Sequence, residues 1–326
     1  MAADLTRARL AHAGAANHRG MFAASARAHG GRVRQRFGAP LALTPDVDVQ
    51  VGFPEVPPAA QSAFAAEVVA YAREQGPLDE VGWWSMDEPG AGLLGSRLLA
   101  RGFSWGWRPN WMALDLDDLV DDQTVPADLA IAEVSPTDGD RLSELPYRPP
   151  AGAADEPSLT YFAAWRGRTG VGVGVVTLHC AELDGEPVGG IYSTSVLPSA
   201  RRQGVGTALT VAACRRARDL GCRYVVLNAT SMGEPVYRRT GFASLGETGQ
   251  TWWMTGRALR APAPPPAVVE LVELIGDGDR TAVERSLRSA QVDLGEPLLC
   301  GLSPHEIATA VGQPDIAERL KAGIGD

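Results

Sequence analysis

The residues best suited to chemistry lie in one run rich in arginine and glycine, V-L-P-S-A-R-R-Q-G-V-G-T at residues 196–207. A predicted strand ends at Val196 and a predicted helix begins near Gly206, so the run connects the two. Its glycines let the main chain approach a ligand, and the free N–H groups of the first helical turn, helped by the helix dipole, attract anions. The pattern predicts a pyrophosphate site with Arg201 and Arg202 at its rim; a plain glycine-rich connector is the alternative. The run is not a Walker A loop, because GxxxxGK[ST] is absent.

This loop also has the spacing of a known motif. R-x-x-G-x-G after a strand resembles motif A of the GNAT acetyltransferase superfamily, and the resemblance continues through Y-V-V-L-N-A-T-S-M-G-E-P-V-Y-R-R-T-G-F at residues 224–242. The two motifs stand at the family's usual separation, and the resemblance covers about residues 129–258. It implies an α/β (α+β) fold with a mixed central sheet flanked by helices, acetyl-CoA as co-substrate and no metal.

The resemblance further implies roles for individual residues. The end of the strand before the loop, here Val196, pairs in the family with pantetheine as an added strand would. Asn228 stands where the family often places a contact to pantetheine or substrate, and Tyr237 matches the tyrosine that protonates the departing CoA thiolate. The loop positions that would hold the pyrophosphate or lie alongside it are Arg201, Arg202, Gln203, Gly204, Val205, Gly206 and Thr207.

The chemistry of acetyl transfer explains these requirements. When an amine attacks the thioester carbonyl, a backbone N–H of the splayed strand can stabilise the oxyanion that forms. The leaving thiolate needs a proton, which makes Tyr237 a reasonable general acid; the alternative is an aromatic side chain that anchors helix to sheet. His179 and Glu182, at the end of a strand beside the expected cleft, are candidate bases. A lone histidine is more often structural, and a water relay would need no single base.

The first half of the chain resembles a degenerate GNAT domain. Both halves contain a strand, a short helix, a Gly-Phe pair (102–103 and 241–242) and a strand with tryptophan, which suggests an ancient duplication. The first half lacks R-x-x-G-x-G, so we expect no CoA site in it. G-A-G-L-L-G at residues 90–95, with Asp115 further on, imitates a dinucleotide fingerprint, but no full βαβ unit surrounds it. We expect this half to cover the open side of the catalytic half and to shape the acceptor cleft.

The C-terminal region is predicted to be a separate helical tail. A-P-A-P-P-P at residues 261–266 is typical of a semi-rigid spacer, and residues 267–326 follow it. G-L-S-P-H-E-I-A at 301–308 resembles the ankyrin opening T-P-L-H-x-A, and a Glu-Arg pair recurs 34 residues apart, at 284–285 and 318–319. Two repeats fall below the usual minimum for independent stability, so we expect the tail to pack on the transferase body or on a second subunit.

Composition narrows the remaining classes of protein. The 326 residues carry a net charge of −9, with a pI of about 5.2, which argues against nucleic-acid binding through a broad basic surface. No apolar stretch is long enough to span a bilayer, and the N-terminus lacks a secretory h-region. The four cysteines form no C-x-x-C pair, so we expect no zinc site, no disulfide framework and a reducing compartment. Arginine-rich residues 1–36 also resemble a transit peptide in composition, and a single lysine, Lys321, favours a GC-rich bacterial source.

The sequence therefore predicts a cytoplasmic acetyltransferase that moves an acetyl group from acetyl-CoA to a primary amine, on a small molecule, by direct attack. Asp155 and Glu156 would line an acidic cleft if the acceptor is polycationic. The expected partners are that amine and, through the tail, a second copy or another protein. A non-catalytic acyl-CoA sensor or partner-binding protein is the alternative, and a longer acyl chain is a second enzymatic reading. The predicted domains are 1–120 (degenerate), 129–258 (catalytic), 261–266 (linker) and 267–326 (tail).

Overall fold

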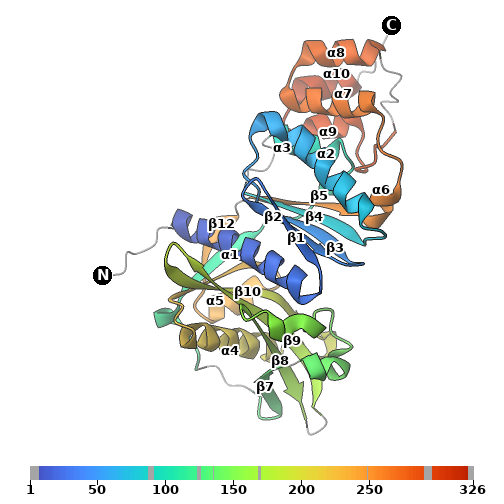
Figure 1. The fold of residues 1–326 in the computed structure, drawn as a ribbon. Coiled ribbons are helices and arrows are strands. Elements are labelled where there is room, and N and C mark those ends of the chain that lie inside the picture. The colour runs from blue at the N-terminus through green and yellow to red at the C-terminus, as the bar shows by residue number, and fades with distance from the viewer. Residues whose placement is uncertain are drawn as a thin grey trace. The chain divides into compact units, whose positions relative to one another are not determined.

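The computed structural model divides the chain into two compact units. It describes residues 7–86, 92–122, 126–134, 136–167, 170–247, 249–289 and 296–321. The first unit contains residues 1–33 and 109–248, and the second contains residues 34–108 and 249–326. Each unit has a mixed sheet flanked by helices (Figure 1), as the sequence predicts.

The first unit is built on a seven-stranded sheet with the order β12-β6-β11-β10-β9-β8-β7. Only β10 and β11 run parallel; the other neighbours whose register is given are antiparallel. Its helices and strands are α1 (Arg7–Ala28), β6 (Asn110–Asp115), β7 (Leu129–Glu133), β8 (Leu159–Arg166), β9 (Val171–Leu183), β10 (Glu186–Val196), α4 (Val205–Asp219), β11 (Tyr224–Ala229), α5 (Glu234–Arg239) and β12 (Ala243–Glu247). Short 3-10 turns lie at η1 (Leu116–Asp118), η2 (Pro136–Leu142), η3 (Ala151–Asp155) and η4 (Pro198–Ala200).

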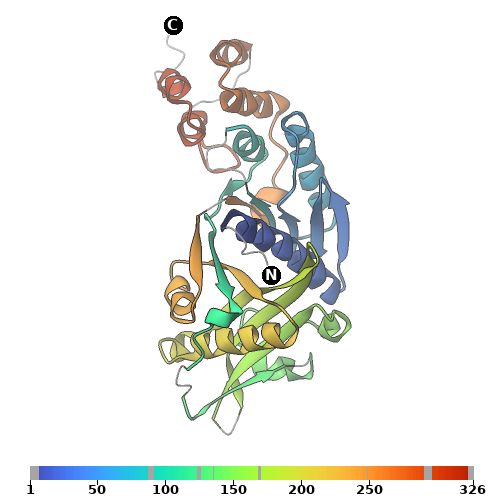
Figure 2. The same cartoon turned by 90° about the vertical axis from the view of Figure 1, so that its left-hand side faces the viewer.

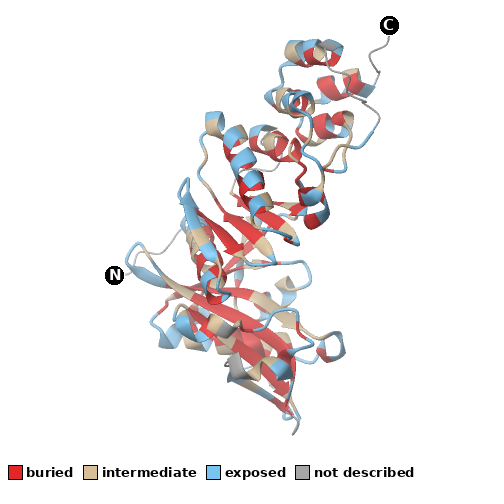
Figure 3. Ribbon diagram, turned by 45° about the vertical axis from the view of Figure 1, so that its right-hand side comes forward, coloured by how far each residue is buried: buried red, intermediate tan, exposed pale blue. Residues whose placement is uncertain are grey.

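Successive side chains of a strand point to opposite faces of this sheet, and each face packs against one long helix. Val225 and Leu227 of β11 belong to the apolar cluster with α4, whereas Val226 between them packs in the cluster that Leu10 of α1 joins. Figures 1 and 2 show α1, in dark blue, and α4, in yellow, on these opposite faces. The approach of α1 is close: a Cβ added to Gly14 would lie 2.6 Å from the Trp111 ring. Figure 3 shows the central strands as mostly buried.

The second unit is built on a six-stranded sheet with the order β1-β2-β3-β4-β13-β5. Helices α2 and α3 cover one face through Phe64, Val68 and Leu98, which join Trp83 and Trp252 in a single core. Its elements are β1 (Arg32–Arg36), β2 (Ala39–Thr44), β3 (Asp48–Gly52), α2 (Pro58–Glu74), β4 (Glu80–Ser85), α3 (Gly92–Leu99), β5 (Ser104–Trp105), β13 (Gln250–Thr255), α6 (Gly256–Arg260), α7 (Pro266–Asp277), α8 (Arg280–Ser289), α9 (Pro304–Ala310) and α10 (Pro314–Lys321).

The units differ from the consecutive domains that the sequence predicts, because each sheet takes one strand from the other half of the chain. Strand β6, expected to finish the first half, pairs with β11 and β12. Strand β13, expected to finish the second half, pairs with β4 and β5. Helix α1 likewise packs in the first unit instead of with the rest of residues 1–120. Alternation of apolar residues specifies that a segment is a strand but not which distant strand it pairs with, so this exchange was not predictable from the sequence.

The predicted tail packs on α3 and extends the core of the second unit. Its apolar residues Val272, Ile275, Ile307 and Ile316 lie in the same cluster as Leu98. Four helices, α7 to α10, make up the described part of the tail. The resemblance of residues 301–308 to an ankyrin opening stays a prediction; there Ser303 and Glu306 form a capping box at the start of α9.

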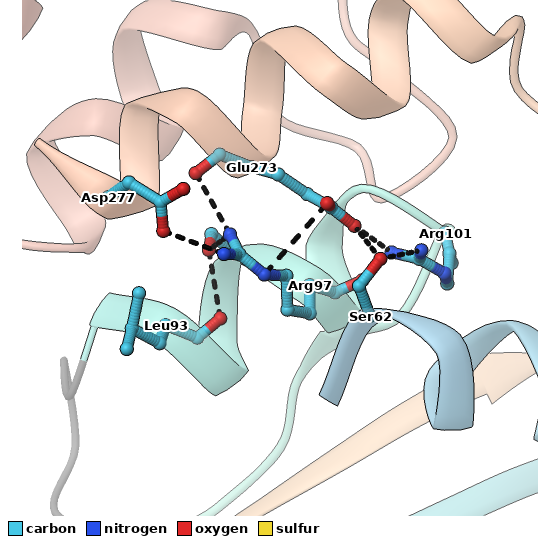
Figure 4. A network of polar contacts seen from close by, with 7 residues as sticks. Ser62, Leu93, Arg97, Arg101, Glu273 and Asp277 are labelled. Carbon is cyan, nitrogen blue, oxygen red and sulfur yellow. Dashed lines mark hydrogen bonds and ion pairs between the residues drawn. The ribbon is translucent and has the colours of Figure 1, made fainter. Parts of the chain in front are cut away.

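A polar network also joins α7 to α3 and to the residues around it (Figure 4). The Glu273 carboxylate lies 2.6 Å from Arg101 Nη1 and accepts a hydrogen bond from Ser62 Oγ at 2.7 Å. Arg97 donates to the Glu273 carbonyl at 2.9 Å and pairs with Asp277 at 2.6 Å. Both arginine side chains are only 11% exposed, so Glu273 compensates charge that is largely removed from water.

The motif at residues 90–95 does not develop into a dinucleotide site. Gly90 and Ala91 lie outside the described residues, and Gly92 begins the eight-residue helix α3. Asp115, the acidic residue of the imitation, belongs to the other unit, where its carboxylate pairs with Arg223 at 3.0 Å.

Candidate active site

The arginine- and glycine-rich loop forms an exposed turn that leads into α4. Gly204 is the N-cap of α4 and has φ +79°, a left-handed conformation that glycine adopts without strain. The first bond of the helix runs from Ala208 N–H to the Gly204 carbonyl at 2.9 Å, so the amides of Val205, Gly206 and Thr207 lie in the unpaired first turn. Unpaired amides of this kind and the helix dipole are what the predicted anion site requires, and the site itself stays a prediction.

The side chains before Gly204 are exposed, and two of them fold back to stabilise the loop. Gln203 Nε2 donates to the Ser199 carbonyl at 3.0 Å, and Arg201 Nε donates to the Val196 carbonyl at 3.2 Å. Arg202 is exposed and has φ +63°. The loop therefore carries two positive charges beside the first turn of α4, as its sequence suggests.

Next to this loop, β10 and β11 separate. Their pairing stops at Ile191 and Leu227, although β10 continues to Val196 and β11 to Ala229. The register of β10 against β9 shifts between Tyr192 and Ser195, which is a bulge in β10. The two strands thus leave an opening between their C-terminal ends, on the side of the loop.

Val196 presents its main chain to this opening. Leu197 N–H donates to the Val173 carbonyl at 2.9 Å, beside the Val196–Gly174 pair. In an antiparallel ladder, hydrogen-bonded and non-hydrogen-bonded pairs alternate, and a bond between the neighbouring residues Leu197 and Val173 marks Val196–Gly174 as a non-hydrogen-bonded pair. The N–H and carbonyl of Val196 therefore point away from β9. An extended ligand in the opening could bond to these groups, although Arg201 already occupies the carbonyl.

Tyr237 lies on α5 with its ring in the core of the first unit. The ring contacts Phe242 edge-on, with centroids 5.8 Å apart, and the residue is 8% exposed. Burial raises the pKa of the phenol, and the nearby side chain of Thr194, a residue of the β10 bulge, partly offsets that rise. The hydroxyl is therefore protonated at neutral pH and lies beside the bulge. The predicted acid and the predicted packed aromatic are compatible descriptions of this residue.

Asn228 is on the face of the sheet that α1 covers. Its amide Nδ2 is 3.0 Å from His18 Nδ1. The His18 ring stacks on Phe22, with centroids 4.4 Å apart, and lies 4.7 Å from the Tyr192 ring. Burial, followed by the nearby His179, lowers the pKa of His18 to about 3, so its imidazole is neutral. Asn228 thus lies at the opening between β10 and β11 and makes a polar contact with His18 of α1.

Comparison with known proteins identifies this part of the chain. Residues 127–242 match the model of the Acetyltransferase (GNAT) family. This segment, about a third of the chain, is similar to a GNAT domain. The match begins two residues before the predicted range of 129–258 and ends inside it. It contains both β10–α4 and β11–α5, while α1 and β6 complete the same unit from outside it.

Several solved structures are similar to the chain. A GCN5-related N-acetyltransferase from Kribbella flavida is 19% identical, with a TM-score of 0.49, and covers 74% of this chain and 94% of its own. A tandem GNAT protein from the clavulanic acid biosynthesis pathway is 15% identical, with a TM-score of 0.45, and the match covers 77% of this chain and 96% of that protein. An acetyltransferase from Trypanosoma brucei is 26% identical, with a TM-score of 0.32, and the match covers 36% of this chain and 93% of that protein. No curated protein matches the chain. The family match, and not these similarities, carries the assignment.

One of the two candidate bases is bound to α1, and the other lies at the end of β10 opposite the bulge. His179 is buried, and its Nδ1 is 3.2 Å from Asn17 Oδ1 of α1. Burial lowers its pKa to about 4, with opposing effects of Glu156 and Arg27. Glu182 is exposed and pairs with Pro187, at the end of β10 opposite the bulge. His179 therefore helps to bind α1, and Glu182 is not near the place where acetyl transfer would occur.

Of the two acidic residues expected to line an acceptor cleft, Glu156 is paired within the fold and Asp155 is exposed. Glu156 pairs with Arg27 of α1 at 2.7 Å and accepts a hydrogen bond from Ser158 at 2.9 Å. The hydrogen bond from Arg27 is the main reason why the pKa of Glu156 is lowered. Asp155 is exposed beside it. Glu156 thus fixes α1 to the turn that contains it, while Asp155 is the carboxylate with free access to water.

Sequence reasoning missed the residues of α1. Asn17 is fully buried, and its Oδ1 accepts a hydrogen bond from Tyr192 Oη at 2.7 Å while its Nδ2 donates to the Val188 carbonyl at 2.8 Å. His18 shares a helical face with Ala11, Ala15 and Phe22, at spacings of three, four and seven residues, and that face is buried. Extending the apolar stripe of the helix through His18 would have marked it as buried.

Neither a metal-ligand cluster nor a membrane-spanning helix is found among the described residues. Among them, no group of three or more histidine, cysteine, aspartate or glutamate side chains could hold a metal ion. Within the same residues, no helix combines the length and apolar character that crossing a bilayer requires.

Proposed function

We propose that the GNAT domain transfers an acetyl group from acetyl-CoA to a primary amine on a small molecule. The observation that carries the proposal is the opening between β10 and β11, with the main chain of Val196 on one side and the first turn of α4 at its end. A diphosphate would bind to the amides of Gly204 to Thr207, and the pantetheine arm would extend along Val196. Arg201 would release the Val196 carbonyl or share it with the arm.

In this proposal, the thioester lies at the β10 bulge and the amine attacks it directly. A main-chain N–H at the bulge would stabilise the tetrahedral oxyanion, because the register shift leaves residues there outside the regular ladder. Tyr237 would then protonate the departing CoA thiolate. Its proximity to Thr194 and its raised pKa support that role. Asn228 lies at the same opening and would contact pantetheine or the acceptor.

The second unit is assigned no CoA site, because R-x-x-G-x-G is absent from its sequence. Its predicted role of covering the catalytic half stays a proposal. The cytoplasmic location is also a proposal and rests on the cysteine pattern.

The test uses the full chain with acetyl-CoA and a panel of primary amines, and measures CoA thiol release together with acetylated product by mass spectrometry. We expect turnover with at least one amine and a loss of about 10²-fold or more in Tyr237→Phe. Tyr71→Phe, a change at another buried tyrosine in the second unit, is the control and should leave turnover unaltered. Tight acetyl-CoA binding without release on any amine would favour the alternative, a non-catalytic acyl-CoA sensor. Equal rates in Tyr237→Phe and the parent chain would remove the tyrosine from the mechanism.

A further inference from the structure

Two cysteine sulfurs lie in contact in the first unit, away from the opening between β10 and β11. Cys222 Sγ and Cys180 Sγ are 3.7 Å apart and share a hydrogen bond. All four cysteines of the chain are free thiols in this structure. The sulfurs of a disulfide are about 2.05 Å apart, so these two must approach each other by less than about 2 Å to bond.

The backbone on both sides of the contact is well fixed. Gly221 ends α4 with φ +84°, as its sequence position predicts, and Cys222 N–H then returns to the Ala217 carbonyl at 3.0 Å. This Schellman-type turn sets the direction of the Cys222 side chain. Cys180 is held in β9 opposite Gly189, and its N–H donates to the Ser158 carbonyl at 3.0 Å. The contact is therefore a consequence of ordered main chain and not of a loose loop.

The contact between the two sulfurs and the lowered pKa of Cys222 distinguish this pair from the other cysteines. The hydrogen bond shared with Cys180 lowers the pKa of Cys222, and burial opposes that change. Cys180 is half-buried, and its pKa is raised by the hydrogen bond to Cys222 and by burial, with a smaller opposing effect of the Arg216 charge. Cys222 is therefore the thiolate of the pair, although only 4% of it is exposed. By contrast, Cys214 is fully buried, and burial raises its pKa. Thiolate character and access are what make a cysteine reactive.

We propose that Cys180 and Cys222 form a reversible thiol–disulfide pair that peroxides oxidise. One thiolate attacks a peroxide oxygen, takes that oxygen as a sulfenic acid and releases water from hydrogen peroxide. The neighbouring thiol then attacks the sulfenic sulfur, forms the S–S bond and releases a second water. Two thiols and one peroxide thus give one disulfide and two waters. An excess of a dithiol such as dithiothreitol reverses the reaction, with its own two thiols oxidised.

The disulfide would tie the C-terminal end of α4 to β9. The two cysteines are 42 positions apart, and the loop that they close contains all of β10 and α4. Closing a loop of this length restricts the unfolded chain, so the oxidised protein should melt about 5–10 °C higher than the reduced protein. This inference is independent of the proposed acetyl transfer.

The experiment treats the reduced full chain with hydrogen peroxide, quenches it, and counts thiols in denaturant before mapping peptides by mass spectrometry. We expect the loss of two of four thiols, a mass decrease of about 2 Da, a Cys180–Cys222 cross-linked peptide, and full recovery with dithiothreitol. Cys180→Ser and Cys222→Ser should each abolish the cross-link. Cys300→Ser, which removes a cysteine of the second unit, should retain it.

Three results would overturn the proposal. The first is four free thiols after peroxide treatment that oxidises a small dithiol completely. The second is sulfinic acid on Cys180 without a cross-link. The third is a disulfide with other partners, including one between two chains. If a serine variant unfolds, the melting temperatures of the oxidised and reduced parent chain still decide the matter, since the proposal requires them to differ.

Discussion

Gly204 allows the sharpest test of the anion-binding loop, because the same helix carries a matched glycine at its other end. Gly204 has φ +79° at the N-cap of α4, and Gly221 has φ +84° just after its C-terminus. Alanine in a left-handed conformation costs about 1–2 kcal/mol. Gly204→Ala and Gly221→Ala should therefore destabilise the protein by similar amounts, measured as the free energy of unfolding in urea.

Only Gly204→Ala should weaken acetyl-CoA binding. If the loop relaxes from its left-handed turn when free, binding must restore that turn at a cost of about 1–2 kcal/mol, which is a factor of about 5–30 in Kd. The added methyl group would also stand between the ligand and the amides of the first helical turn, so we expect a loss of at least about 10-fold. Isothermal titration calorimetry with acetyl-CoA measures both variants. Equal affinities in the two, or no affinity in the parent chain, would refute the assignment of the loop.

Three further predictions concern the acid, the buried histidines and the tail. If Tyr237 is the general acid, turnover should fall as the pH rises through its raised pKa, and Tyr237→Phe should lack that falling limb; an unchanged pH–rate profile would argue against the role. His18 and His179 have folded pKa values of about 3 and about 4, below the unfolded value of about 6.5, so their contribution to stability is complete above pH 6.5 and lost as the pH falls below it. Between pH 6 and 5, each histidine should lower the free energy of unfolding by about 1.4 kcal/mol per pH unit. In His179→Gln, the free energy of unfolding in urea should therefore change less steeply with pH. An identical pH dependence would mean that His179 is charged in the folded state. Glu273→Ala should cost about 3 kcal/mol because it leaves the nearly buried Arg101 without its carboxylate, although Arg97 keeps Asp277. Glu270→Ala, at an exposed position of the same helix, should cost less than about 0.5 kcal/mol in the same assay.

Local features of the site were predictable from the sequence because their causes are local. The end of a strand at Val196, the start of a helix beside Gly204 and the left-handed turn at Gly221 all follow from residues within one turn of the feature. The mixed sheets flanked by helices were also expected, and the GNAT match agrees with the motif. The roles of these residues toward acetyl-CoA stay predictions.

Long-range features were not predictable in this way. Strand Ala243–Glu247 was missed, because exposed and half-buried residues along it give no strong apolar alternation. The positions of β6 and β13 depend on which distant strand offers a free edge, and that choice leaves no mark on the segment itself. The burial of His18 can be read from its helical face, but its contact with Asn228 cannot, since Asn228 is 210 positions away.

The strand exchange sets an order of events during synthesis on the ribosome. Helix α1 is among the first segments to emerge, but the surface that covers its buried face consists of strands from β6 to β12, the last of which ends at Glu247. Sheet pairing for the second unit is incomplete until β13 has been made. Nascent chains that stop short of these strands would therefore hold an amphipathic, alanine-rich helix without its sheet, a state in which chaperones or proteases would find exposed apolar surface.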